Sequence, residues 1–559
     1  MTSKFIQSGN NIHEMIEGEK GALQFKSSSN DGLDLFFKLV RGYDRIELNQ
    51  QLEHCLTSDS PNDIADLFIL MFQTRNCRGG KGERVLFYEM IKTLYIQYPQ
   101  TVINLMDLVP HYGYYKDYVV ILQELIESPL YKILNDKIIN IMVSQIQKDN
   151  VELELSKKEN RVAELSMLAK YAPRANKQYR SIAKAIYRKM YPKDVKAEEK
   201  YRKVLAKINK ALSTTEVLMC AKNYSGIEFR KVPSVCLMKW RNAFLNERKG
   251  ECPDALKETG NRFPHDIDRV VSRKNLECAI KDECINGKQL MPHEIVKTFM
   301  KGSITGVEEE LLSLQWGKVK ENVLQNRGVG LNLGNVVPLV DVSGSMEGIP
   351  LEVAISLGIL VSEITNPAFS DTFITFSTKP EWVSLKGLTL QEKIRKTRTS
   401  GFGLSTNLMK AIEMILDIVV SKELIENEIP DLMVFSDMQF DKADNNASKK
   451  TTYETIQRLF AEAGMKICGK PYRTPRIIFW NLRATTGSPV SSSTKNVQLL
   501  SGFSPSLLKA VMNGDDTSSE ALYRLVIDDK LYDLVREILN DSQEFKLLYY
   551  QKNNIKKNI

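Results

Sequence analysis

The sequence predicts a protein of two parts, an all-α HEAT-like helical-repeat part over residues 1–325 and an α/β doubly wound domain over residues 326–559. In the first part, apolar residues recur at the spacing of amphipathic helices. In the second, short apolar runs alternate with helical stretches. Such alternation predicts a mostly parallel sheet with helices on both of its faces.

The helical segments of the first part are separated by short turns that contain Gly or Pro, and they are expected at 62–75, 83–98, 101–109 and 116–134. Two of these turns resemble each other, with Lys81 and Lys116 35 residues apart, a period that suits stacked helix pairs. The turn "CRGGKGER" at 77–84 lacks the spacing of a phosphate-binding loop, so it is expected to join two helices. The polar stretch at 147–161 is expected to be an insertion or linker.

The second part contains apolar or β-branched runs that are expected to be strands, at 335–342, 371–378, 431–438, 476–483 and 496–503. Helical stretches lie between them, at 350–364, 407–421 and 451–464. Ligands of such folds bind beyond the carboxyl ends of the strands. Asp341 and Asp437 each follow a predicted strand, so both are expected at that edge.

The composition is that of an ordinary globular protein, with 43% hydrophobic and 26% charged residues among 559. The sequence shows neither a signal peptide nor an apolar run of membrane-spanning length, so we expect an intracellular, cytoplasmic protein without a membrane partner, in a host cell or a virion if it is viral. No CxxC pair occurs among the eight cysteines, and the five histidines lack metal-ligand spacing. A zinc, redox or histidine-based hydrolytic centre is therefore not expected.

Positive charge is concentrated between residues 170 and 210, which contain fourteen Lys or Arg and three acidic residues. Tyrosines are interleaved with these cations, and the combination suits phosphate contact and base stacking in structured or single-stranded RNA. The alternative is a solvated helix face whose tyrosines belong to the core. The candidate nucleic-acid contacts are Lys170, Arg174, Lys177, Arg180, Lys184, Arg188 and Lys189.

The stretch "DVSGSM" places Asp341, Ser343 and Ser345 on alternate positions directly after a predicted strand. It resembles the DxSxS signature of the von Willebrand factor A domain, a Rossmann-like fold with a metal-ion-dependent adhesion site. "GFGLSTNLMKAI" is similar to the second motif of that site and "FSDMQF" to the third, which implies Thr406 and Asp437 as further ligands. Met438 stands where the third motif usually has glycine, and Ser405 precedes Thr406 where the second usually has glycine.

Hydroxyl and carboxylate oxygens of this kind are the ligands that Mg²⁺ prefers, with Mn²⁺ or Ca²⁺ as alternatives. Few anionic ligands leave the cation electrophilic, and an open coordination position accepts a carboxylate or phosphate oxygen from a partner. The competing interpretation is that the residues around Ser343 only form a turn and cap the helix that begins near Pro350.

The whole arrangement also resembles a known architecture. A basic helical part joined to a von Willebrand A-like domain is similar to the Ro ribonucleoprotein class, in which a HEAT-like TROVE region binds small RNAs. Four blocks resemble an uncharacterised family of plants and large DNA viruses: "LDLFFKLVRG", "QTRNCRGGKGER", "VPHYGYYKDY" and "LAKYAPR". That closer resemblance implies no activity.

Two functions follow as hypotheses. The first is a non-enzymatic RNA-binding ribonucleoprotein scaffold with a metal-ion-dependent adhesion site. The second is a metal-dependent protein interaction module that captures an acidic protein ligand without RNA. A metal-dependent hydrolase is less favoured, because Ser343 stands where haloacid-dehalogenase-like phosphatases need a second aspartate as general acid.

Overall fold

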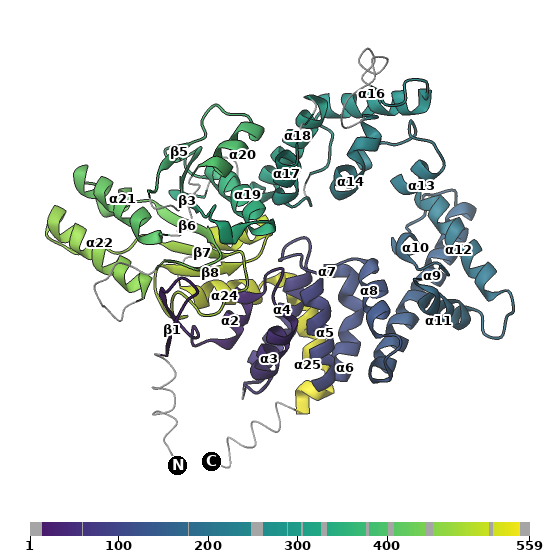
Figure 1. Ribbon diagram of the computed structural model, residues 1–559. Coiled ribbons are helices and arrows are strands. Elements are labelled where there is room, and N and C mark those ends of the chain that lie inside the picture. The colour runs from purple at the N-terminus through teal and green to yellow at the C-terminus, as the bar shows by residue number, and fades with distance from the viewer. Residues whose placement is uncertain are drawn as a thin grey trace. The chain divides into compact units, whose positions relative to one another are not determined.

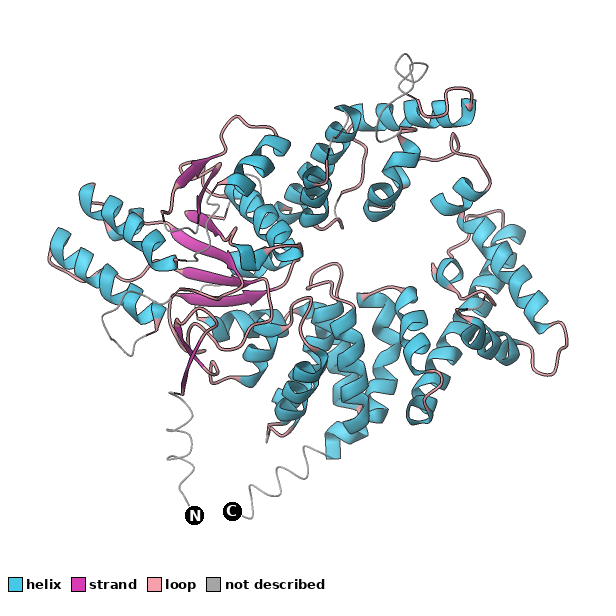
Figure 2. Ribbon diagram, viewed as in Figure 1, coloured by secondary structure: helices cyan, strands magenta, loops and turns pink. Residues whose placement is uncertain are grey.

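A six-stranded sheet, magenta in Figure 2, is the centre of the C-terminal half in the computed structural model. The structure describes residues 14–547 except 59, 177, 248–260, 288, 303, 305, 326–332, 376–378, 401–406, 442–450 and 514–517. The strands lie in the order β5-β4-β3-β6-β7-β8. Their bounds are β3 (Val336–Val340), β4 (Thr372–Thr375), β5 (Trp382–Ser384), β6 (Asp431–Ser436), β7 (Ile477–Asn481) and β8 (Val497–Ser501).

The pairing confirms a mostly parallel sheet. Strands β3, β4, β6, β7 and β8 run parallel to one another, and β5 pairs antiparallel with β4. All five predicted strands are present. Strand β5 was not predicted, because it has three residues and buries only Val383, which is too short a pattern to recognise in a sequence.

Helices cover both faces of this sheet, as predicted. Figure 1 shows α21 (Leu408–Ser421) and α22 (Thr452–Cys468) on one side and α19 (Ile349–Ile364) and α20 (Leu390–Thr399) on the other. Burial on both faces explains why β3, β7 and β8 are buried at every position, in contrast to the alternating burial of a half-exposed strand.

Two compact units share the chain, and each contains several separate segments. The α/β unit takes its described residues from 1–74, 78–86 and 287–532, and the helical unit takes them from 75–77, 87–286 and 533–559. The predicted boundary at 325 follows the change of sequence pattern, whereas these units group the first 74 residues with the sheet. Further elements of the α/β unit are β1 (Met15–Glu17), β2 (Leu23–Phe25), α2 (Asp31–Lys38), α3 (Arg45–Leu56), α4 (Pro61–Arg75, whose last residue belongs to the helical unit), α17 (Pro292–Met300), α18 (Gly306–Leu324), α23 (Leu508–Asn513) and α24 (Ser519–Ile527).

The helical unit contains α5 (Val85–Gln97, whose first two residues belong to the α/β unit), α6 (Pro99–Leu105), α7 (Val109–Tyr112), α8 (Tyr115–Leu125), α9 (Lys132–Lys158), α10 (Leu168–Tyr171), α11 (Arg180–Met190), α12 (Ala197–Leu212), α13 (Thr215–Cys220), α14 (Ser234–Phe244), α16 (Ile267–Lys281) and α25 (Asp533–Asp541). The predicted linker at 147–161 is wrong, because most of it belongs to α9. Ile146 and Leu153 stay buried two turns apart, so the helical spacing continues through this polar stretch. No described helix is long and apolar enough to cross a membrane.

The turn at 77–84 joins α4 to α5, as predicted, and it places a lysine in the core of the α/β unit. Lys81 is fully buried, and its Nζ donates to the carbonyls of Phe36 (2.5 Å) and Leu39 (3.0 Å) and to Ser501 Oγ (2.7 Å). These three acceptors match the three N–H donors of an ammonium group. Burial acts against the charged form and lowers the pKa of Lys81 well below 10.5. The carbonyls belong to the end of α2, where a cation is favoured.

Lys116, the lysine aligned with Lys81 in the sequence, is exposed near the start of α8. The two turns are therefore not equivalent in structure, and the HEAT-like repeat stays a prediction.

A buried ion pair joins α4 and α8 in the helical unit. Arg75 Nε donates to Asp117 Oδ2 at 2.9 Å, and Tyr88 donates to Asp117 Oδ1 at 2.6 Å. Both charged side chains are almost completely buried. Gly113 permits this approach, because a Cβ there would lie 2.2 Å from Asp117 Oδ2 and 2.8 Å from Arg75 Nε.

Asp117→Ala should destabilise the protein by about 3–5 kcal/mol, because it leaves the Arg75 guanidinium buried without its counter-ion. The double variant Arg75→Met/Asp117→Leu should recover most of that loss, since it removes both charges. Urea unfolding measures both free energies. Equal stability of the wild type and Asp117→Ala would contradict the structural role of the pair.

His293 gives the α/β unit a pH-dependent stability. The side chain is 3% exposed on α17 and packs edge-on against Phe503, and its pKa is lowered to about 3 by burial, with Arg41 and Lys297 acting in the same direction. Below pH 6.5 the unfolded chain binds a proton that the folded protein does not. Folding stability therefore falls as the pH decreases.

His293→Leu should remove this contribution, which costs about 1.4 kcal/mol for each pH unit below the unfolded pKa. Urea unfolding from about pH 7 to about pH 5 should show a shallower loss in the variant than in the wild type. Parallel slopes for the wild type and His293→Leu would refute the assignment.

Candidate functional site

Two buried carboxylates lie side by side at the carboxyl edge of the sheet. Strands β3 and β6 pair in parallel with Val340 opposite Phe435, and the Asp341 N–H continues the ladder by donating to the Phe435 carbonyl at 3.0 Å. Asp341 follows β3 and Asp437 follows β6, and both are 0% exposed. The structure thus brings together the two acidic residues that the sequence predicted for this edge.

The carboxylate of Asp341 is oriented by two hydrogen bonds. Ser343 N–H donates to Oδ1 at 3.0 Å, and Ser436 Oγ donates to Oδ2 at 2.7 Å. Burial raises the pKa of Asp341 above 3.8, and the charge of Asp437 acts in the same direction. A cation at this position would relieve both effects.

Asp437 has an oxygen that the protein leaves unsatisfied. Its Oδ1 accepts from Gln439 N–H at 3.1 Å, whereas the buried Oδ2 has no hydrogen-bond partner within the described ranges. A buried carboxylate oxygen without a partner is costly. It is therefore a candidate ligand atom.

The serine hydroxyls complete the described part of the site. Ser343 is buried and Ser345 is half-buried, and their Oγ atoms are 3.1 Å apart. The competing interpretation holds in part. Asp341 and the two serines form a turn, in which Ser343 N–H donates to Asp341 Oδ1 and Met346 N–H donates to the Ser343 carbonyl. The cap of α19 is Gly348, and no side-chain capping bond is made there. Thr406 lies outside the described residues.

This donor set fits a hard divalent cation, because every candidate ligand is an oxygen and only two of them are charged. Asp341, Ser343, Ser345 and Asp437 would hold such an ion. When bound, it would supply a Lewis-acidic position for an oxyanion. The conformation of Met438, where the von Willebrand motif usually has glycine, is left-handed, with φ of 63°. Glycine adopts this backbone conformation more readily than methionine does.

The basic stretch contains one helix face that is free of ion pairs within the described chain. On α11, Ile182, Ala183 and Ile186 are buried. Arg180, Lys184 and Arg188 are exposed one turn apart on another face, and we call these three residues the α11 stripe. Neither the stripe nor the exposed Lys189 makes an ion pair with another described residue.

Other cations of the stretch are neutralised. Lys170 pairs with Glu216 at 2.9 Å, and Lys203 of α12 pairs with Glu199 at 2.6 Å. Lys200 and Lys207 also pair with carboxylates. Arg174 is exposed, and Lys177 lies outside the described residues.

The tyrosines of the basic stretch are divided between core and surface. Tyr201 is buried and donates to the Pro173 carbonyl, so it belongs to the core, as the alternative interpretation expected. Tyr179, Tyr187 and Tyr191 are half-buried.

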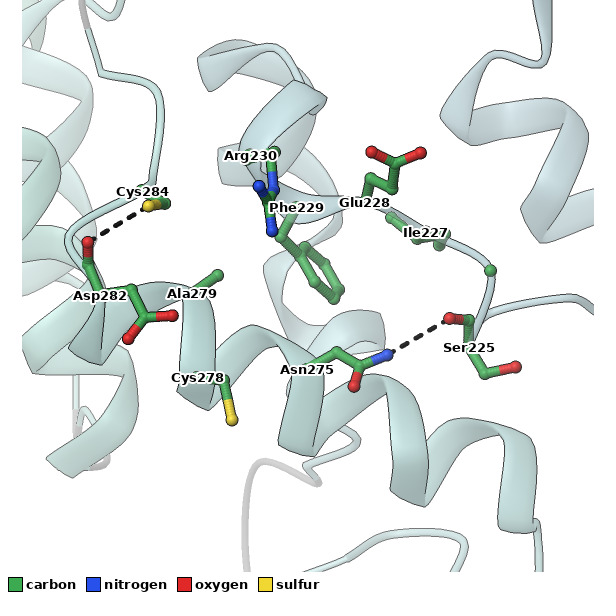
Figure 3. Close-up of a pocket in the computed structure, with 11 residues that line it drawn as sticks. Ser225, Ile227, Glu228, Phe229, Arg230, Asn275, Cys278, Ala279, Asp282 and Cys284 are labelled. Atoms are coloured by element: carbon green, nitrogen blue, oxygen red, sulfur yellow. Dashed lines mark hydrogen bonds between the residues drawn. The ribbon is translucent and has the colours of Figure 1, made fainter.

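A pocket of about 290 Å³ lies in the helical unit beside η3 (Phe229–Lys231) and α16 (Figure 3). Glu228, Arg230 and Asp282 line it with charges of both signs. Asn275 and Cys284 make hydrogen bonds to backbone carbonyls of Ser225 and Asp282. The lining also includes the thiols of Cys278 and Cys284, but it includes no histidine that could activate them. The oxygen side chains at the edge of the sheet are therefore the stronger candidate for a functional site.

The fold and site define a class of protein, one that combines a helix-rich unit with an α/β unit whose sheet edge carries convergent oxygen side chains. A family model described as "Domain of unknown function (DUF2828)" matches residues 18–130 and 121–328, which together exceed half of the chain. This protein therefore belongs to that family. A second model, "Domain of unknown function (DUF7788)", matches residues 335–545 and covers the candidate metal site.

The chain is also similar to a viral protein, "Uncharacterized protein L728" of Acanthamoeba polyphaga mimivirus. The two are 29% identical over 528 residues, which cover 91% of this chain and 86% of the relative. The expected resemblance to an uncharacterised family with viral members is thereby confirmed.

Mg²⁺ or Mn²⁺ should raise the thermal stability of the wild type and leave Asp437→Asn unaffected. A ligand that binds only the folded state at 100 times its dissociation constant stabilises by about 2.7 kcal/mol. Asp417→Asn, on the exposed surface of α21, is the matched control and should respond as the wild type does. A metal response retained by Asp437→Asn would exclude Asp437 as a ligand.

Proposed function

We propose that this protein is a non-enzymatic RNA-binding scaffold whose α/β unit carries a divalent-cation site for an oxyanion. The observation that supports RNA binding most directly is the α11 stripe. Its side chains are solvent-exposed and unpaired within the described chain, whereas four nearby lysines of the same basic stretch are matched to carboxylates. Unpaired cations on one helix face attract a polyanion most effectively, because contact does not first require an internal ion pair to break.

The spacing of the stripe also suits a nucleic-acid backbone. Positions four residues apart on a helix follow one another at about 6 Å along the axis, which is comparable to the distance between successive phosphates of an extended strand. In the sequence, the half-buried Tyr179 precedes the stripe and the half-buried Tyr187 lies within it, and both offer ring edges or faces to bases. RNA is favoured over duplex DNA because stacking on aromatic side chains requires unpaired bases.

A metal-dependent protein interaction module is the second candidate. It is favoured by the unsatisfied Asp437 Oδ2 beside Asp341, since a cation bound there would capture an acidic side chain of a partner. Chelation would then abolish binding, and salt would have a weaker effect. Catalysis is not part of either proposal, because the site offers a hydroxyl, Ser343, where phosphoryl transfer would need a second acid.

The triple variant Arg180→Glu/Lys184→Glu/Arg188→Glu should reduce RNA affinity at least about tenfold and lower the slope of log K against log salt by about 2, because three phosphate contacts are lost. Binding of a single-stranded RNA by the full chain, measured at several salt concentrations, gives both quantities.

The control moves the same charge change to the α/β unit. Lys386, Lys422 and Lys466 are exposed, and their reversal to Glu changes the net charge by the same amount. If both triple variants weakened binding equally, the effect would come from overall charge, and the α11 stripe would be excluded as the contact surface.

A further inference from the structure

A second pocket, of about 300 Å³, lies in the α/β unit and is lined by residues of α2, α3, α4 and α24. Figure 1 shows α24 beside α2, and these two helices are in contact. The volume is at the lower end of the range that small-molecule sites occupy. The charged side chains of the lining are four carboxylates and one guanidinium: Asp31, Asp63, Asp66, Glu520 and Arg524.

The guanidinium of Arg524 does not neutralise the pocket, because two carboxylates already share it. Arg524 donates to Asp66, and it also donates through Nε and Nη2 to the two carboxylate oxygens of Asp528, at 3.1 and 2.5 Å. Burial nevertheless raises the pKa of Asp66 above 3.8, and the charges of Asp528 and Asp63 act in the same direction. The pair of Arg524 with Asp66 therefore leaves the other carboxylates of the pocket uncompensated.

The other three carboxylates each lie in the first turn of a different helix: Asp31 in α2, Asp63 in α4 and Glu520 in α24. An acidic residue is favoured there, because a helix N-terminus carries about half a positive charge. Three N-termini thus offset only about half of the charge of three carboxylates. The Cys55 thiol, also in the lining, is affected by the remainder: burial raises its pKa, and the charges of Asp31 and Asp63 raise it further. The pocket has an excess of negative charge.

A buried phenol without a partner is the second feature of the pocket. Tyr523 is 2% exposed and belongs to the lining, and its hydroxyl makes no hydrogen bond with another described residue. This hydroxyl lies against Gly32, another lining residue, because a Cβ at Gly32 would be 2.5 Å from the Tyr523 oxygen. A buried hydroxyl that lacks a partner is costly. A bound N–H donor would satisfy it, since the phenol oxygen can accept a hydrogen bond.

The arrangement suits a cation with several charged groups better than a single metal ion. A small divalent cation needs oxygen ligands that converge on one point, whereas these carboxylates come one each from three helices. A polyamine carries separate ammonium groups on an apolar chain, so it can meet separate carboxylates. Leu67 and the ring of Tyr523 offer apolar contact for its methylene groups.

We propose that this pocket binds a polyamine, with one ammonium group donating to the Tyr523 hydroxyl and others pairing with Asp63 and Glu520. Such pairs are charge-assisted, and each ammonium supplies up to three N–H donors. The inference goes beyond the proposed function and does not depend on it, because the lining includes no residue of the α11 stripe or of the candidate metal site.

The test is calorimetric titration of the full chain with spermidine, in saturating Mg²⁺ and at about pH 7.5. Mg²⁺ occupies metal sites beforehand, and the pH keeps histidines largely neutral, which matters because His54 lies 3.5 Å from Asp31. Asp63→Asn/Glu520→Gln should weaken spermidine binding at least about tenfold, because charge-assisted hydrogen bonds are lost. Tyr523→Phe should weaken it about threefold or more and leave the thermal stability unchanged, since the hydroxyl has no partner within the described chain.

Each variant has a matched control in the α/β unit. Glu413→Gln/Asp417→Asn removes the same charge from the exposed surface of α21 and should bind spermidine as the wild type does. Tyr453 is buried, and its hydroxyl donates to the Lys495 carbonyl at 3.0 Å. Tyr453→Phe should therefore lower the thermal stability and leave spermidine affinity unchanged.

Four results would overturn the proposal, and none of them would affect the RNA contact or the metal site. Equal weakening by the two acidic double variants would mean general attraction to negative charge. Wild-type affinity in Tyr523→Phe would exclude the phenol as a contact. Equal affinity for butylammonium and spermidine would show that one ammonium is enough. Spermidine binding only in the absence of Mg²⁺ would show that the pocket prefers a metal ion.

Discussion

The parallel pairing of β3 with β6 is the constraint on which the candidate site depends. Because Val340 lies opposite Phe435, the first residue after each strand falls at the same edge of the sheet. In this register Asp341 lies opposite Ser436, and a shift of one residue would break the hydrogen bond between their side chains. The ladder bond from Asp341 N–H to Phe435 and the side-chain bond from Ser436 to Asp341 fix the register where the chain leaves the sheet. The fold thereby holds two carboxylates close together in a buried place.

Buried polar groups elsewhere explain the sequence blocks that suggested a family. The block "QTRNCRGGKGER" supplies Arg75 to the helical unit and Lys81 to the α/β unit, and both side chains are buried and hydrogen-bonded. The block "VPHYGYYKDY" supplies Gly113 and Asp117, which complete the Arg75 ion pair. Each of these residues has a geometric or electrostatic reason for its identity. These residues of the two blocks therefore have a role in folding.

Some cations of the basic stretch are paired with carboxylates and others are not, and this difference affects the functional proposal. Pairing with carboxylates neutralises Lys170, Lys200, Lys203 and Lys207, some of them through partners distant in sequence. The α11 stripe has no such partners among the described residues. Among the seven predicted RNA contacts, the α11 stripe and Lys189 are exposed and make no ion pair with another described residue, whereas Lys170 is already paired with Glu216. Arg174 is exposed.

The sequence by itself determined the elements that depend on local pattern. Apolar periodicity located the five parallel strands and the helices between them, and the position of Asp341 and Asp437 after two strands placed them at one edge of the sheet. Only the tertiary structure decided contacts between distant segments. It placed Lys20 on Ser345, buried Lys81 against Ser501, returned residues 533–547 to the helical unit and continued α9 through a polar stretch. The reason is physical: periodicity records which face of an element is buried, but it does not record which element buries it.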